Sequence, residues 1–102
     1  MRVGEKEIGF LFTVGVHCDY LDWCCGNESR SKDTGSLVKI EYATRAYAKK
    51  NGTNDFLTVA EMRDMPTWEF RPILEAALKA EAEQSKPQIE TVEAPKKKEA
   101  GK

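Results

Sequence analysis

Residues 7–12 have the period of a β-strand, since Ile8, Phe10 and Phe12 alternate with Glu7, Gly9 and Leu11. Gly4 and Glu5 supply a turn that opens with glycine. We therefore predict a short β-hairpin in which residues 1–3 pair with residues 7–12. An isolated hairpin is only marginally stable, so we expect it to lie against helices.

The next stretch has helical periodicity, with apolar residues at spacings of four, three and four: Val14, Cys18, Leu21 and Cys25. Tyr20, Trp23 and Cys24 widen this apolar stripe. Thr13 can cap the helix at its start, and Gly26 suits a left-handed residue at its end. We predict a helix that ends at Gly26 and buries its cysteines as small apolar residues.

Residues 27–35 have no large apolar side chain and many turn formers, which predicts an exposed loop. A second helix is then predicted from Ser36 to the Asn51-Gly52 stop signal. Its predicted apolar side carries Leu37, Ile40, Ala43 or Thr44, Tyr47 and Ala48, and its polar side carries Lys39, Glu41, Arg45 and Lys49.

A capping box marks the start of a third, short helix, because Thr58 and Glu61 are three residues apart. Leu57 and Met62 flank the box as a hydrophobic staple. The Met65-Pro66 pair should end this helix, because a proline ring disfavours helical geometry in the preceding residue.

Residues 67–84 carry a further helical stripe, formed by Trp68, Phe70, Ile73, Leu74, Ala77 and Leu78. Pro72 either kinks this helix or begins it, and we favour a turn over residues 67–71 followed by a helix that starts near Pro72. Residues 85–102 contain prolines, charges and few apolar groups, so we predict a disordered charged tail.

The predicted fold is mainly α, with about four helices and a short N-terminal β-hairpin. A chain of 102 residues holds one domain, which we place at residues 1–84, followed by the tail at residues 85–102. The apolar runs are far shorter than the ~20 residues that cross a bilayer, and no export signal is evident. We therefore expect a soluble cytoplasmic protein that makes no membrane contact.

The charge balance argues against a protein that works mainly by neutralising phosphates, since the net charge is −1. One segment is basic: residues 30–50 hold six basic residues against two acidic ones. An alternative function is therefore a small helical nucleic-acid-binding regulator that uses Arg45, Lys49 and Lys50 on the second helix. No helix-turn-helix signature accompanies this segment, so we rank nucleic-acid contact below protein contact.

The reactive residue types do not form a catalytic or metal-binding pattern. His17 and Cys24 are seven residues apart, or roughly 10 Å along one helix, whereas ligands of one zinc ion almost touch. His17 and Cys18 point about 100° apart on a helix and do not face each other. We predict no catalytic residues, no metal site and no cofactor, so the protein is expected not to be an enzyme. A thiol enzyme or redox sensor that uses Cys24 and Cys25 is the remaining enzymatic alternative.

The order of these elements resembles the tail assembly chaperones of long-tailed bacteriophages. The resemblance covers residues 1–84 and is carried by the hairpin that leads into Phe10-Leu-Phe-Thr-Val-Gly-Val16, the helix that ends at Gly26, the capped entry Leu57-Thr-Val-Ala-Glu-Met62, and Trp68 to Leu78 before a charged tail.

The resemblance implies a non-enzymatic protein of the host cell cytoplasm that is absent from the mature virion. Such a chaperone binds the tape measure protein, keeps it soluble and helps recruit the tail tube protein during tail morphogenesis. Large apolar groups are abundant near the last helix, and those left outside the core would suit an apolar helix of a partner. We predict partner contact at Trp68, Phe70 and Met65, and self-association is left open.

Overall fold

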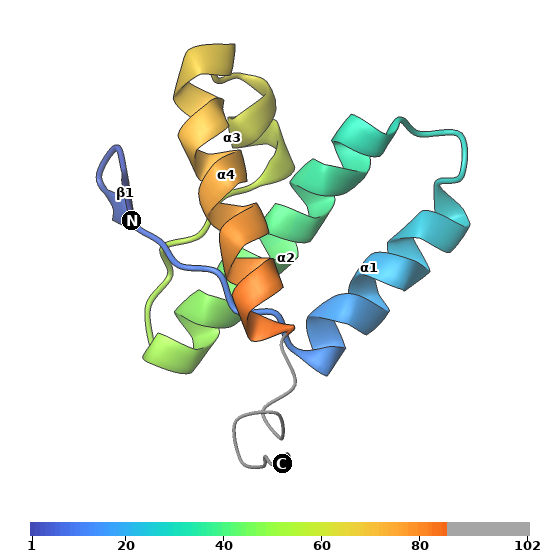
Figure 1. Ribbon diagram of the computed structural model, residues 1–102, viewed down its shortest axis with the longest axis horizontal. Helices are drawn as coiled ribbons and strands as arrows, with labels where there is room; N and C mark the ends of the chain where they lie inside the picture. The colour runs from blue at the N-terminus through green and yellow to red at the C-terminus, as the bar shows by residue number, and fades with distance from the viewer. Residues whose placement is uncertain (86–102) are drawn as a thin grey trace, which may run out of the picture.

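The computed structural model describes residues 1–85 and shows the predicted mainly helical fold in that part of the chain (Figure 1). The elements are β1 (Arg2–Val3), β2 (Lys6–Glu7), α1 (Val14–Gly26), α2 (Lys32–Asn51), α3 (Val59–Arg63) and α4 (Thr67–Gln84). Apart from Ser85, which follows α4, the predicted disordered tail lies outside the described residues.

The hairpin is confirmed but shorter than predicted. β1 and β2 are antiparallel, with Arg2 opposite Glu7, and Gly4 between them has a φ of 60° that favours glycine. The strand does not continue to Phe12, because the three residues before Gly4 leave nothing further to pair with. Beyond Ile8 the chain instead crosses α2, where the Leu11 amide donates to the Ala43 carbonyl at 3.1 Å.

Both ends of the loop between α1 and α2 differ from the prediction. α2 begins at Lys32 instead of Ser36, because the Ser31 side chain accepts a hydrogen bond from the Thr34 amide and caps the helix four residues earlier. Gly26 does not adopt a positive φ. The Asn27 side chain instead donates to the Trp23 carbonyl at 2.8 Å and closes the last turn of α1.

The start of α3 is confirmed, and the start of α4 is not where we predicted it. Thr58 and Glu61 form both hydrogen bonds of the capping box. α4 begins at Thr67 and continues through Pro72, so residues 67–71 are helical and not a turn. The proline removes the donor for the Trp68 carbonyl, but both residues are exposed and water can replace that donor.

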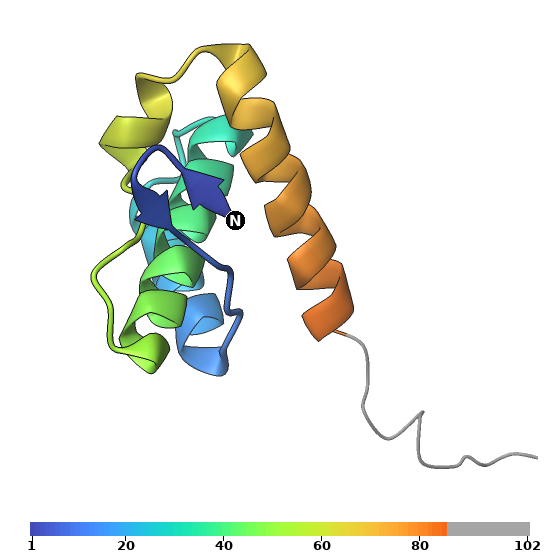
Figure 2. The same ribbon diagram turned by 90° about the vertical axis from the view of Figure 1, so that its left-hand side faces the viewer.

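α2 lies at the centre of the molecule, with α1 along one side of it and α4 crossing it (Figures 1 and 2). The buried core lies between α2, α3, α4 and the segment after the hairpin, and consists of Ile8, Ile40, Leu57, Met62, Ile73 and Ala77. Both residues of the predicted staple belong to this core. No residue of α1 belongs to it.

Candidate protein-binding groove

The feature best suited to holding another molecule is a groove between α1 and α4, which we call the α1–α4 groove. It consists of two hollows of about 280 and 70 Å³ that share Phe12, Tyr20, Lys39 and Glu81 as lining residues. The other apolar side chains along it are Val14, Val16, Ile40, Leu74, Ala77 and Leu78. α1, α2, α4 and the segment before α1 therefore all contribute to one mainly apolar surface.

The α4 side of the groove follows from the width of the apolar stripe on that helix. Ile73 and Ala77 are buried in the core, and Leu74 is half-buried beside them. Leu78 continues the same stripe but is 57% exposed. The stripe is wider than the core can cover, so its edge faces the groove.

The charged residues of the groove link three helices. The Lys39 ammonium of α2 lies 2.9 Å from the Glu81 carboxylate of α4 and 4.8 Å from the centre of the Tyr20 ring of α1. A side-chain hydrogen bond with Cys24 and, to a lesser extent, burial raise the pKa of Tyr20 above its ordinary 10.0. The phenol therefore stays neutral near pH 7. The groove thus has a largely apolar lining with the Lys39–Glu81 ion pair shared by both hollows, and Thr13, His17, Ser36 and Ser85 add polar groups to it.

The segment before α1 is fixed to the end of α4. The Gln84 side chain accepts a hydrogen bond from the Phe12 amide at 2.8 Å and donates one to the Phe10 carbonyl at 2.7 Å. These two bonds hold the Phe12 side of the groove in place.

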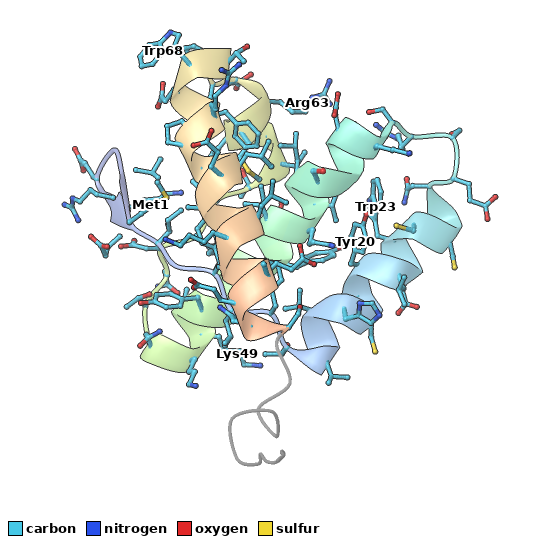
Figure 3. The ribbon with its side chains drawn as sticks, viewed as in Figure 1. Met1, Tyr20, Trp23, Lys49, Arg63 and Trp68 are labelled. Carbon is cyan, nitrogen blue, oxygen red and sulfur yellow. The ribbon has the colours of Figure 1, made fainter. Side chains whose placement is uncertain are left out.

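The structure does not bring the three predicted partner residues to one exposed surface. Trp68 is 76% exposed at the start of α4, far from Tyr20 (Figure 3). Phe70 and Met65 are half-buried and pack against the core. Trp68 instead borders a separate hollow of about 290 Å³ beside the hairpin, whose lining includes Met1 and Arg2.

The predicted burial of the α1 stripe is wrong. Val14 is 80% exposed and Leu21 47% exposed, and Cys18 and Cys25 are exposed as well. The residues that pack on α2 lie on the opposite side of the helix: Tyr20 and Trp23 point toward α2 (Figure 3), and Val16 is buried and lies beside Tyr42 and Ala46. α1 is apolar on two sides, and the side with the two large rings packs inward because it buries more apolar area.

A glycine in α2 accommodates the rings of α1. A Cβ atom at Gly35 would lie 3.1 Å from the Tyr20 hydroxyl and 3.8 Å from the Trp23 ring. Gly35 is buried, although the sequence places it in a stretch that we predict as exposed loop. The absence of a side chain at this position lets α1 approach α2 closely.

The basic residues of α2 are partly neutralised by neighbours. Arg45 lies 2.6 Å from the Glu41 carboxylate and its guanidinium is 4.9 Å from the centre of the Phe56 ring. Arg45, Lys49 and Lys50 do line one hollow of about 580 Å³, together with the acidic Asp19. A phosphate chain would meet both signs of charge there.

Metal-ligating residue types do not gather in the part of the chain that the structure describes. Within residues 1–85 there is no group of three or more His, Cys, Asp and Glu side chains that could hold a metal ion. His17 and Cys24 lie on the single helix α1, seven residues apart. None of the helices between residues 1 and 85 is long and apolar enough to cross a membrane.

No family model, curated protein or solved structure matches this chain. The groove residues Tyr20, Leu74 and Leu78 are absent from the predicted partner set. The excess width of the α4 stripe was the sequence signal for Leu74 and Leu78, whereas no local signal indicated that Tyr20 lines the groove.

Proposed function

We propose that this protein is a tail assembly chaperone of a long-tailed bacteriophage, acting by protein binding and not as an enzyme. It would bind the tape measure protein in the host cytoplasm, keep it soluble, help recruit tail tube subunits and leave before the virion matures. The resemblance over residues 1–84 supports this class of partner. The α1–α4 groove is the observation that supports the mode of binding, because an elongated apolar surface between two helices suits an amphipathic helix.

The energetic basis of binding is apolar burial along the groove. Fully burying a leucine contributes about 1.5–3 kcal/mol, so covering the exposed part of Leu78 contributes about 1–2 kcal/mol. Leu74, Phe12 and Tyr20 offer further apolar area beside it. A bound helix would present apolar residues at spacings of three and four, since that spacing places them on one face.

Trp68 is a second contact for the same long client. Tryptophan is the side chain most enriched among residues that dominate binding energy, and this one is exposed at the far end of α4 from the groove. Phe70 and Met65 support its end of the helix from the core side. We expect Trp68 to contribute less than Leu78, because it stands outside the groove.

Co-expression with a helical segment of the tape measure protein encoded near this gene tests the proposal. The wild-type chain should move that segment into the soluble fraction, and Leu78→Asp should abolish the rescue because it places a charge in the groove. Leu21→Asp is the matched control, since it changes an exposed leucine outside the groove and should rescue as well as wild type. Absence of rescue by the wild type, or full rescue by Leu78→Asp, contradicts the proposal.

The alternative of a nucleic-acid-binding regulator rests on the hollow lined by Arg45, Lys49 and Lys50. It predicts DNA or RNA binding that weakens steeply with salt and is lost in a Lys49→Glu, Lys50→Glu double variant. The chaperone proposal predicts that the same double variant still rescues the tape measure segment.

A further inference from the structure

The outward side of α1 carries an apolar stripe that nothing in residues 1–85 covers. We call this set the α1 outer stripe: Val14, Cys18, Leu21 and Cys25. Successive helical residues are about 100° apart, which places the stripe opposite the buried Val16 and opposite Trp23, which points toward α2 (Figure 3). The stripe therefore lies on the side of α1 that faces away from α2, and only Val14, in the first turn, also borders the α1–α4 groove.

The stripe residues follow one another at spacings of four, three and four, which is the spacing of a coiled-coil seam. In such a seam the first and fourth residues of each seven-residue repeat face the partner helix. In this register Val14 and Leu21 occupy fourth positions of the heptad, and Cys18 and Cys25 occupy first positions. His17 borders the seam on one edge and Asp22 borders it on the other. α1 contains no lysine or arginine.

We propose that the α1 outer stripe pairs with the same stripe of a second copy of this chain, with the two α1 helices parallel. In a parallel coiled coil, the residue that precedes a first heptad position faces the residue five places later on the partner helix, and here that residue is His17, before Cys18. His17 would then face the partner's Asp22 on both edges of the seam. A histidine ring keeps an N–H to donate to a carboxylate in either charge state.

The antiparallel arrangement lacks this complementarity. It would place Asp22 across from the partner's Gly15, and His17 across from the partner's Cys24, so the Asp22 carboxylate would have no histidine N–H to accept from. The edge residues of α1 therefore favour a parallel second copy as the occupant of the stripe.

The pairing has a low ordering cost and a small area. α1 is already held on α2, so it need not fold on association, and the two bodies would lie on opposite sides of the pair. A helix of 13 residues offers less than the ~1,200 Å² of a standard interface. We therefore expect a weak dimer that forms between ~1 µM and ~1 mM chain.

Sedimentation velocity of the full chain, kept reduced and studied over that concentration range, tests the pairing. The wild type should shift from monomer to dimer as concentration rises, and Leu21→Asp should weaken the dimer about tenfold or more by placing a charge in the seam. Leu78→Asp is the matched control, because it changes an exposed leucine on α4 and should dimerise like wild type.

Cross-linking with a short bismaleimide, which adds to thiols without an oxidant, reports the direction of the pair. A chain that keeps only Cys18 should give a covalent dimer, since Cys18 faces the partner's Cys18 across a parallel seam. A chain that keeps only Cys24, at the edge of the seam, should give several-fold less.

Three results would overturn the pairing: a monomer at every concentration, a dimer that Leu21→Asp leaves intact, or preferential cross-linking through Cys24. The inference does not depend on the proposed function. Failure of the groove appears as lost rescue in the wild type, whereas failure of the pairing appears only in sedimentation and cross-linking.

Discussion

The two sides of α2 are packed in different ways. On one side, six buried residues form a continuous core: four from α2, α3 and α4, Ile8 after the hairpin, and Leu57 just before α3. On the other side, α1 rests on α2 through Val16, Tyr20 and Trp23, and Val16 is the one buried residue of α1. The first side is a core to which several elements contribute, whereas the second is a single helix that packs through one side and leaves its outer side exposed.

This difference explains where the candidate binding surfaces lie. The α1–α4 groove and the α1 outer stripe both border the less densely packed side, where apolar groups remain exposed. Burial in the core removes most apolar side chains from any interaction with a partner. The comparison therefore predicts that substitutions on the two sides have separable effects on stability and on binding.

The largest effect should come from truncating the core. Ile73 is 2% exposed, so Ile73→Ala should lower the free energy of unfolding by about 2–5 kcal/mol. Val16→Ala removes apolar volume from the α1 side and should cost clearly less. Urea denaturation of both variants measures the difference. Equal losses of unfolding free energy would contradict the claim that the two sides of α2 are packed differently.

A buried hydroxyl should have the next largest effect. Thr44 is fully buried, donates to the Ile40 carbonyl at 2.9 Å and accepts from the Leu57 amide at 3.2 Å. Thr44→Val keeps the shape but leaves the buried Leu57 amide without its partner, which should cost about 1–3 kcal/mol. Thr44→Ser, which keeps the hydroxyl, is the control, and it should retain more stability than the valine variant in the same urea titration.

A side chain at Gly35 should act on α1 alone. Gly35→Leu forces atoms against the Tyr20 and Trp23 rings, at a cost of about 1–3 kcal/mol for overpacking. Hydrogen exchange should show faster exchange in α1 and unchanged protection around Ile40 and Ile73. Uniform loss of protection across both sides would mean that α1 belongs to the same cooperative unit as the core.

The smallest effect should be the pH dependence of the Glu61 carboxylate, which contacts Lys6 of the hairpin. A hydrogen bond from Lys6 at 2.7 Å, together with the Thr58 amide, lowers the pKa of Glu61 below its ordinary 4.5. A lowered carboxyl pKa stabilises the fold above about pH 4.5, and this contribution is lost as the pH falls through the folded value. Glu61 is partly exposed, so the contribution should stay under about 1 kcal/mol.

Thermal denaturation between pH 6 and pH 3 measures that contribution. Glu61→Gln should be less stable than wild type at pH 6, and the gap should close toward pH 3. A gap that stays constant with pH would show that the capping geometry, and not the carboxylate charge, carries the effect.

Local signals predicted most of the fold. The Thr58 capping box, the Gly52 stop and the order of four helices after a hairpin are encoded within a few residues and are confirmed. The start of α4 was mispredicted because the exposed position of Pro72 lets water replace the lost helical hydrogen bond. The start of α2 was mispredicted because a serine and a threonine at 31 and 34 outcompete Ser36 as a cap.

The inward face of α1 could not be predicted from periodicity. Two apolar stripes lie on opposite sides of that helix, and spacing alone ranks the one with Val14 and Leu21 as highly as the one with Trp23. The choice depends on Gly35, which is fifteen positions from Tyr20 and twelve from Trp23 and accommodates their rings only in the folded chain. The groove that follows from this choice was therefore also hidden from the sequence.

The most direct test of the central claim is an NMR titration of the ¹⁵N-labelled full chain with an amphipathic helical peptide from the tape measure protein. Binding in the α1–α4 groove predicts saturable shift changes at Tyr20, Leu74 and Leu78, with lesser changes at Trp68, and their loss in Leu78→Asp. Shift changes confined to the surroundings of Lys49 and Lys50, or none at saturating peptide, would contradict the account.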